Sequence, residues 1–190
     1  MNKILIIQSN PAEGSYSEAL AAAYAEGAAG AEVRTIHLSQ LDFNPVLTGG
    51  YSNKEPLEQD LQDAQAHIKW ADHLVFVYPT WWGGPPALLK GFIDRVFLPG
   101  FAYKYVKGKA LPEQLLKGKT ARIIVTMDAP GWYYRFFQGM AGHKMMKINI
   151  LQFCGVKSVR FTTLYEVRKS SLAKRQGWLS KVKQLGERSA

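Results

Sequence analysis

The strongest constraint on the fold of this chain is a regular alternation between short apolar segments and longer segments with helical character. Apolar or β-branched runs that suit buried strands recur at 3–8, 32–38, 73–79, 120–127 and 156–164. Helical spacing of apolar residues, or an alanine-rich composition, predicts helices at 17–29, 56–70, 85–97, 139–153 and 171–188. Such strand–helix alternation predicts a parallel sheet with helices on both faces.

The length of the chain and its lack of internal repeats indicate one domain that spans residues 1–190. A chain of this size can bury a full core in a single domain. Five strands in such a domain favour the doubly wound, flavodoxin-like order 2-1-3-4-5. The Rossmann order is disfavoured, because the loop after the first strand, SNPAEGSYS at 9–17, lacks the G-x-G-x-x-G pattern of dinucleotide-binding folds.

The composition excludes several classes of protein. Apolar residues make up 47% of the chain and charged residues 21%, which is typical of globular proteins. No apolar run reaches the roughly 18 residues that a membrane-spanning helix needs. The single cysteine, Cys154, excludes an internal disulfide, and the four histidines show no metal-ligand spacing. We therefore expect no metal site and a cytoplasmic location, with the N-terminal residues forming a strand and not a signal peptide.

The net charge of +9 is concentrated in the second half of the chain. Residues 1–100 hold 6 of the 24 basic residues and 11 of the 15 acidic ones, so 101–190 hold 18 and 4. Two interpretations stay open: a solvated basic face, or contact with an anionic partner such as a phosphorylated ligand or a membrane surface. The basic residues are dispersed and form no nucleic-acid-binding motif, so we expect no nucleic-acid partner.

The loops after the first, third and fourth strands should meet at one edge of the sheet, where such folds bind ligands. In the first of these loops, Ser9, Asn10, Ser15 and Ser17 come just before a helix. Hydroxyl groups beside a helix N-terminus suit a phosphate group. The alternative interpretation is that Ser15 or Ser17 simply caps the helix.

The composition of the loop after the third strand, TWWGG at 80–84, favours close contact with a flat ligand. Gly83 and Gly84 lack Cβ atoms, which lets the backbone approach a ligand closely, and Trp81 and Trp82 provide flat apolar walls. Adjacent side chains diverge, so both tryptophans can hardly be buried in the core. A flat aromatic ligand explains this loop better than core packing does.

The loop after the fourth strand, TMDAPGWYYRFF at 126–137, adds polar groups and more aromatic surface. Thr126 has a hydroxyl for a ring edge, and Asp128 can accept from N–H groups of the loop or cap it. A dense aromatic cluster follows and is typical of a binding surface. Its members are Trp132, Tyr133, Tyr134, Phe136 and Phe137.

These motifs resemble those of one enzyme family. The segment YPTWWGGPPALLKGFIDRVFLPGFAY at 78–103 resembles the flavin-binding segment of NAD(P)H:quinone oxidoreductases of the DT-diaphorase type, which include bacterial members. SNPAEGSYS resembles their phosphate loop, and FNPVL at 43–47 resembles their Phe-Asp-Pro-Val-Leu stretch. FCGV at 153–156 resembles the turn before their last strand. The resemblance covers most of the chain in order.

The resemblance implies roles for particular residues. Flavin phosphate would lie on the first loop, and the isoalloxazine ring on the second, with the third loop closing over it at Thr126 and Asp128. The implied phosphate contacts are Ser9, Ser15, Tyr16 and Ser17, and the implied ring contacts are Pro79, Thr80, Trp81, Trp82 and Gly83. The family is usually dimeric, with the active site completed by the other subunit, so a homodimer is expected.

Two departures from the family pattern affect these expectations. The family commonly has Thr-Thr-Gly-Gly after the fourth strand, where this chain has TMDAP. Some members also use a Tyr and a following His to stabilise reduced flavin. Tyr134 matches that Tyr and becomes the predicted catalytic residue, but the position of the His falls at Met140. We therefore expect His143, three residues on, to be structural or solvent-facing.

The function implied by the resemblance is a ping-pong hydride transfer from NAD(P)H through flavin to a quinone or a similar flat acceptor. FMN is favoured over FAD, because the short chain leaves little surface for an adenosine. The shared substrate slot would be formed by Trp81, Trp82, Trp132 and Tyr134. Two alternatives stay open: a flavodoxin-like electron carrier, or a regulatory flavoprotein subunit of a membrane transporter that docks through the basic C-terminal half.

Overall fold

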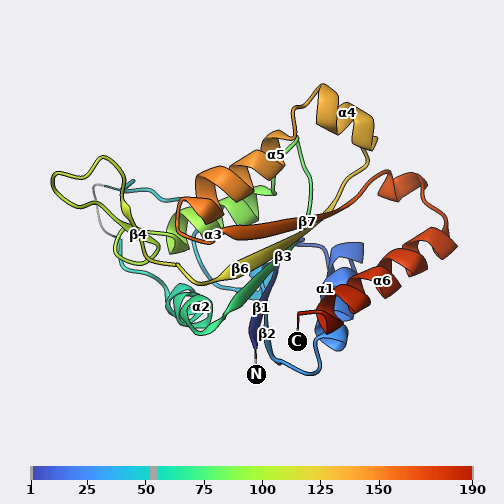
Figure 1. The fold of residues 1–190 in the computed structure, drawn as a ribbon, viewed down its shortest axis with the longest axis horizontal. Helices are drawn as coiled ribbons and strands as arrows, with labels where there is room; N and C mark the ends of the chain where they lie inside the picture. The colour runs from blue at the N-terminus through green and yellow to red at the C-terminus, as the bar shows by residue number, and fades with distance from the viewer. Residues whose placement is uncertain (1, 52–54, 190) are drawn as a thin grey trace.

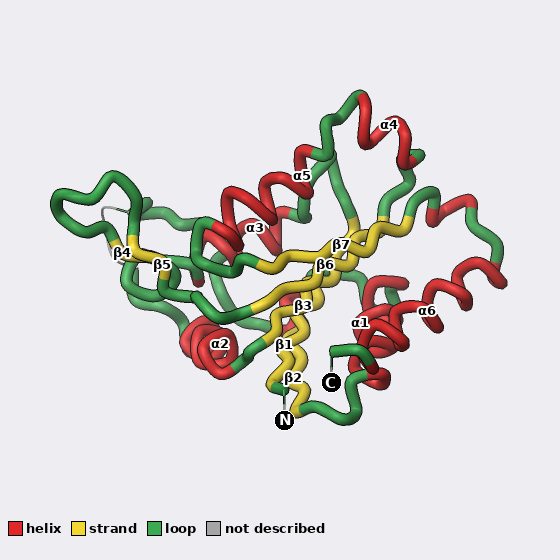
Figure 2. Tube along the Cα trace, viewed as in Figure 1, coloured by secondary structure: helices red, strands yellow, loops and turns green. Residues whose placement is uncertain are grey.

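The structure is a computed structural model that describes residues 2–51 and 55–189. Its centre is a parallel sheet of five strands in the order β2-β1-β3-β6-β7 (Figures 1 and 2). Because β6 and β7 are the fourth and fifth predicted strands, this order confirms the predicted flavodoxin-like arrangement. The strands are β1 (Lys3–Gln8), β2 (Glu32–His37), β3 (His73–Pro79), β6 (Thr120–Thr126) and β7 (Ser158–Leu164).

Helices cover both faces of the sheet, as predicted (Figure 1). One face is covered by α1 (Tyr16–Gly27) and α6 (Leu172–Glu187). The other is covered by α2 (Gln59–Trp70), α3 (Ala87–Val96), α5 (Ala141–Lys144) and the π-helical segment η2 (Met145–Gln152). Two short 3₁₀ turns, η1 (Leu38–Gln40) and η3 (Val167–Lys169), and a two-stranded ribbon of β4 (Tyr103–Lys104) and β5 (Glu113–Gln114) complete these elements.

The apolar strands separate two hydrophobic cores. Because successive side chains of a strand point to opposite faces, Leu5 and Ile7 of β1 enter the core beneath α2 and α3. Ile4 and Ile6 enter the smaller core beneath α1 and α6. All four side chains are fully buried, which is why this strand reads as a continuous apolar run.

The sequence prediction needs correction between 126 and 153, in one loop and in the helix that follows it. The segment 131–136, expected to be part of a loop, forms the short helix α4 (Gly131–Phe136) after Pro130. The helix expected over 139–153 begins instead at Ala141, after Met140 with a positive φ of 55°, and widens to a π-helix from Met145. Apolar spacing does not distinguish a π-helix from an α-helix, so the sequence pattern could not show this.

Helices α1 and α6 pack together unusually closely, at two glycines. A Cβ atom added to Gly27 would lie 1.9 Å from the carbonyl oxygen of Lys183. One added to Gly186 would lie 2.3 Å from the carbonyl oxygen of Tyr24. Only glycine permits this backbone approach, which fixes α6 against α1 and so positions the segment that leads into α6.

Among residues 2–51 and 55–189, no helix combines the length and the apolar character needed to cross a membrane.

Candidate functional site

A cleft of about 300 Å³ lies at the carboxyl edge of the sheet, where the loops after β3, β6 and β7 meet. It brings together five of the predicted site residues from two loops: Pro79, Thr80, Trp81, Thr126 and Asp128. The backbone N–H of Thr80 donates to the carbonyl oxygen of Thr126 at 2.7 Å, which holds the two loops side by side. This edge is where a parallel sheet of this order binds its ligands.

The third wall of the cleft was not predicted from the sequence. It consists of Val167 and Arg168 in η3 and Arg175 in α6, with Met127 beside them. The strand order could have predicted this wall, because the loop after the fifth strand must reach the same edge of the sheet as the loops after the third and fourth. The two arginines make this wall positively charged.

Asp128 caps the segment that forms this third wall. Its Oδ1 atom accepts a hydrogen bond from the backbone N–H of Arg168 at 2.8 Å. The N–H of Val167 also donates to the carbonyl oxygen of Met127, at 3.2 Å. The hydrogen bond of Asp128 is thus made to the loop after β7, and not to the loop after β6 that both sequence interpretations considered.

The double-tryptophan loop forms a tight reverse turn. The N–H of Trp81 donates to the carbonyl oxygen of Gly84 at 2.9 Å, and the N–H of Gly84 donates back at 3.0 Å. The two central residues, Trp82 and Gly83, both have positive φ angles, of 51° and 80°. Such a type I′ turn favours glycine and asparagine, so a tryptophan at Trp82 is strained.

The turn presents groups that nothing in the described part of the chain uses. Neither the N–H of Trp82 nor that of Gly83 donates to any acceptor among residues 2–51 and 55–189. The side chain of Trp82 is fully exposed, and that of Trp81 is 47% exposed. A strained turn with two free donors and two exposed indole rings is suited to a flat ligand that carries hydrogen-bond acceptors on its edge.

The predicted phosphate loop lies between β1 and α1. Ser15 is the N-cap of α1, and its Oγ accepts from the N–H of Glu18 at 3.3 Å, as the capping interpretation requires. Ser17 is buried, and the hydroxyl of Tyr16 donates to the carbonyl oxygen of Arg175 at 2.7 Å. That contact joins the start of α1 to the segment that forms the third wall of the cleft.

Ser9 provides a test of whether this loop fits a phosphate group. Its side chain is fully buried, and its Oγ has no hydrogen-bond partner within the described ranges. The N–H groups of Tyr16 and Ser17, in the first turn of α1, are likewise donors without an intrahelical acceptor. An unpaired buried hydroxyl and free helix N–H groups in one loop fit an anionic group.

Tyr134 does not lie where the sequence analysis expected. Its side chain is only 1% exposed, so it does not form the wall of an open slot. Its hydroxyl lies 2.7 Å from Nδ1 of His143 and accepts from the backbone N–H of His143 at 3.2 Å. The side chain of His143 is also buried, and its Nε2 lies 2.8 Å from the hydroxyl of Thr163 in β7.

Of the two predicted interpretations of His143, structural or solvent-facing, the structure therefore shows the structural one, with Tyr134 as the hydrogen-bond partner. Counting along the sequence placed the partner at Met140, but the left-handed conformation of Met140 turns the chain so that α5 places His143 against Tyr134. The solvent-facing interpretation of His143 is excluded by its burial. A positive φ at a methionine is not visible in the sequence, so spacing alone could not find this pair.

Burial determines the protonation of the pair. It lowers the pKa of His143 to about 4 and raises the pKa of the Tyr134 phenol. Burial disfavours the charged form of each group, because both are removed from water. Near neutral pH the pair is a neutral hydrogen-bonded unit.

The low pKa of His143 predicts a loss of stability in acid. An unfolded histidine, with a pKa of about 6.5, takes up a proton before the folded one does, so the free energy of unfolding falls as pH drops from about 6.5 toward 4. We expect His143→Gln to reduce this loss by about 2 kcal/mol between pH 7 and 4.5, measured by urea unfolding at both pH values. His37→Gln, at the end of the edge strand β2, is the matched control. An unchanged pH dependence in His143→Gln would contradict the assignment.

The aromatic cluster lies mostly on α4, which projects from the body of the molecule (Figure 1). The side chains of Trp132, Phe136 and Phe137 are 60%, 75% and 72% exposed. The ring of Phe137 packs against that of Trp132 at 5.9 Å and stacks on that of Tyr133 at 5.5 Å. Of the predicted slot residues, the structure thus exposes Trp81, Trp82 and Trp132 and buries Tyr134.

The strand order defines a doubly wound α/β protein, and the cleft lies at the carboxyl edge, where proteins of this class bind ligands. A family model described as the flavodoxin-like fold matches residues 2–186. The chain belongs to this flavodoxin-like family.

Known proteins similar to this chain include oxidoreductases. An "uncharacterized NAD(P)H oxidoreductase" of Haemophilus influenzae is 34% identical over 128 residues, which cover 65% of this chain and 62% of that protein, less than two thirds of its length. The crystal structure of Smu.1420 from Streptococcus mutans is 34% identical, with a TM-score of 0.84, covering 97% of this chain and 98% of that one. An NAD(P)H:quinone oxidoreductase from Methanothermobacter marburgensis is 25% identical, with a TM-score of 0.80 and coverage of 97% and 94%.

Proposed function

We propose that this chain is a flavin-dependent NAD(P)H oxidoreductase that reduces quinones or similar flat acceptors by two-electron transfer, with FMN as the favoured cofactor. The observation that carries the proposal is the strained turn Trp81–Gly84, which presents two free N–H groups and two exposed indoles beside a cleft at the ligand-binding edge. The names of the similar proteins from Haemophilus and Methanothermobacter support the reaction class.

The residues present fit the two ends of FMN. The buried, unpaired hydroxyl of Ser9 and the free N–H groups of Tyr16 and Ser17 would hold the phosphate. Thr80, Trp81 and the turn that follows would hold the ring, with its polar edge toward the N–H groups of Trp82 and Gly83. Thr126, in the opposite wall, would complete the ring site.

The flavin, when bound, supplies the chemistry of accepting a hydride and passing on two electrons. The chain's own residues orient the reactants and exclude water from one side of the cleft. Fixed backbone N–H groups of the turn stabilise negative charge without reorganising, since two hydrogen bonds already hold that backbone in place. The exposed faces of Trp82 and Trp132 would bind nicotinamide and acceptor in turn, as a ping-pong sequence requires.

Tyr134 takes a positioning role in this proposal, in place of the catalytic role first predicted for it. Its buried hydroxyl lies close to Gly142, and the backbone of Gly142 lies against Gly83 and Gly84 of the turn. The hydrogen bonds from Tyr134 to His143 and from His143 to Thr163 extend this contact to β7. The pair would thereby fix the turn relative to the sheet.

A homodimer forms part of the proposal. The exposed aromatic side chains of α4 would be covered by a second copy of the chain. Analytical ultracentrifugation of the flavin-loaded protein should give a mass of two chains. A monomer at micromolar concentration would remove this part of the proposal and leave the reaction untouched.

The reaction is tested by mixing FMN-loaded protein with NADPH or NADH in a stopped-flow instrument without oxygen. Rapid bleaching of the flavin absorbance by one equivalent, followed by recovery on adding a quinone, is the expected result. Bleaching without a semiquinone signal marks two-electron transfer. Failure of both nicotinamides to bleach the flavin would favour an electron carrier or a regulatory subunit, and failure to bind FMN or FAD would refute the flavin assignment.

Replacing Trp82 should separate stability from function. In Trp82→Asn the turn gains an Asn-Gly pair, which type I′ turns favour. We expect the free energy of unfolding to rise by about 1 kcal/mol, because the strain of a left-handed tryptophan is relieved. FMN binding should weaken about tenfold, because one indole face is lost. Phe136→Asn, at an exposed aromatic residue of α4, is the control and should give no gain in stability.

A further inference from the structure

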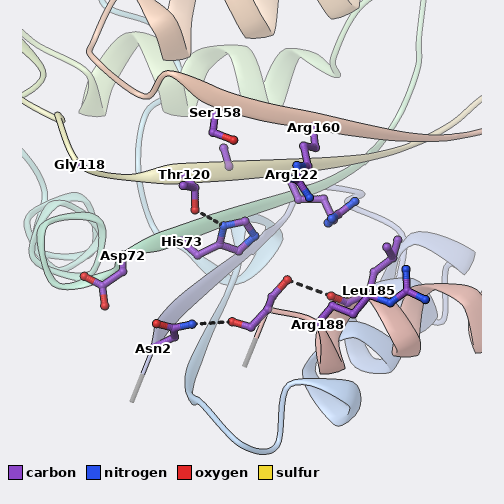
Figure 3. Close-up of a pocket in the computed structure, with 12 residues that line it drawn as sticks. Asn2, Asp72, His73, Gly118, Thr120, Arg122, Ser158, Arg160, Leu185 and Arg188 are labelled. Atoms are coloured by element: carbon purple, nitrogen blue, oxygen red, sulfur yellow. Dashed lines mark hydrogen bonds between the residues drawn. The ribbon is translucent and has the colours of Figure 1, made fainter.

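Figure 3 shows a second and larger pocket, of about 470 Å³. It lies at the amino-terminal ends of the strands, and the cleft lies at their carboxyl ends. Its floor is formed by the amino-terminal ends of β3, β6 and β7, at His73, Thr120 and Ser158. The C-terminal end of α6 forms another wall, with Leu185 and Arg188. The proposed flavin reaction uses none of these residues.

Two arginines on the floor of the pocket face each other across neighbouring strands. Arg122 of β6 and Arg160 of β7 are direct partners in the parallel register, so both side chains leave the same face of the sheet. Like charges in such positions repel each other and destabilise a sheet. Arg188 approaches them from α6 and adds a third positive charge (Figure 3).

No carboxylate of the described residues neutralises these charges. Among residues 2–51 and 55–189, Arg122, Arg160 and Arg188 form no salt bridge. Asp72 lies in the wall of the pocket, but its Oδ2 accepts from the N–H of Lys3 at 3.1 Å. In Figure 3 its carboxylate points away from the arginines.

Arg122 is the residue that makes this arrangement costly. Its side chain is only 8% exposed, and within the described ranges its Nε has no hydrogen-bond acceptor. Its Nη1 atom donates to the hydroxyl of Thr162 at 3.2 Å, which leaves the charge itself uncompensated. A buried guanidinium without an anion is unfavourable, because desolvation is not offset.

The pKa of His73 reflects the positive charge in the pocket. Burial, and then the charges of Arg122 and Arg160, lower its pKa to about 4, so it is neutral near pH 7. Its Nδ1 lies 2.6 Å from the hydroxyl of Thr120, and its Nε2 lies 3.2 Å from that of Tyr24. The pocket thus combines a positive field with neutral hydrogen-bonding groups.

We propose that this pocket binds a small ligand through a phosphate or diphosphate group, held by Arg122, Arg160 and Arg188. Guanidinium groups bind phosphate oxygens in pairs, and three of them suit an anion with more than one negative charge. The hydroxyl of Ser158 adds a neutral donor on the floor, whereas that of Thr120 is engaged with His73. The volume lies within the usual range for small-molecule sites. Because the pocket and the cleft lie at opposite edges of the sheet, the proposal does not depend on the flavin assignment.

Inorganic pyrophosphate is the probe for the test, titrated into the FMN-saturated protein by isothermal calorimetry at about 150 mM salt. Saturating FMN is present to occupy the proposed phosphate loop beside α1, and the arginine variants assign the heat to this pocket whether or not flavin binds there. We expect one site per chain. Arg160→Gln and Arg188→Gln should each weaken the affinity for pyrophosphate about tenfold, which is the loss expected for one charge-assisted contact. Both side chains are exposed, so neither substitution should disturb the fold.

Lys181→Gln is the matched control, because it removes one exposed positive charge from the same helix, α6, outside the pocket. It should bind pyrophosphate as the unchanged protein does. The proposal is overturned if the unchanged protein binds no pyrophosphate, or if Lys181→Gln weakens binding as much as the two arginine variants. It is also overturned if a glutamate-rich peptide binds the pocket more tightly than pyrophosphate, since the partner would then be an acidic protein.

Discussion

Replacing Gly142 with alanine should weaken FMN binding and slow quinone reduction by about 100-fold, the size of effect that a displacement of about 1 Å in an active site produces. The added Cβ would lie 2.4 Å from the carbonyl oxygen of Gly83 and 3.2 Å from Cα of Gly84. It would also lie 3.1 Å from the hydroxyl of Tyr134. Backbone cannot yield as a side chain does, so the turn must move away from α5.

This prediction is measured by fluorescence titration of FMN and by the steady-state rate with NADPH and a quinone. Ala141→Gly is the matched control, because it changes the neighbouring residue of the same short helix without adding an atom. It should lower stability by about 0.5–1 kcal/mol and leave the turn in place. Normal FMN affinity in Gly142→Ala would show that the contact between α5 and the turn does not position the flavin site.

Replacing Gly186 with alanine should lower the free energy of unfolding by about 3 kcal/mol, at the upper end of the usual cost of overpacking. The new Cβ would lie 2.3 Å from the carbonyl oxygen of Tyr24 and 2.9 Å from the nitrogen of Ala28. These two atoms form one of the last hydrogen bonds of α1. The clash must therefore separate α6 from α1 or disrupt the end of α1.

The same helix provides a control with the opposite sign. Gly177 of α6 has no atom within 4 Å of an added Cβ, so Gly177→Ala should raise stability by about 0.5–1 kcal/mol through helix propensity alone. Urea unfolding of the two variants gives the comparison directly. Equal effects in the two variants would show that the close approach of α1 and α6 is not a significant constraint on the fold.

The sequence was sufficient for the sheet because hydrophobicity determines it. Three of the strands, β1, β3 and β6, are buried apolar runs between polar turns, and residues such as Ile4 to Ile7 leave little choice of element. The outer strands β2 and β7 are less buried and are marked by β-branched residues instead. The predicted helix boundaries and helix type were wrong where the local backbone is irregular. Met140 in a left-handed conformation and the π-helix that begins at Met145 depend on tertiary contacts, and no short-range pattern encodes them.

The site was predictable as far as it follows from topology. The loops after β3 and β6 do meet, and they bring Thr80 beside Thr126. The assigned contacts of these residues with flavin, the cytoplasmic location and the single-domain assignment stay predictions. The pairing of Tyr134 with His143 was missed because the eight residues between the two include the end of α4, a turn at Met140 and the start of α5. The arginine pair on β6 and β7 became visible only with the strand register.

The left-handed backbone at Trp82 has a consequence for binding kinetics. Two hydrogen bonds between Trp81 and Gly84 already hold this conformation in the free protein. The turn is therefore ordered during folding and not when the ligand binds, so ligand binding loses little entropy in ordering it, as in other preorganised sites. Association should then be limited by encounter and orientation, and differences in affinity among related flat ligands should appear mainly in their residence times.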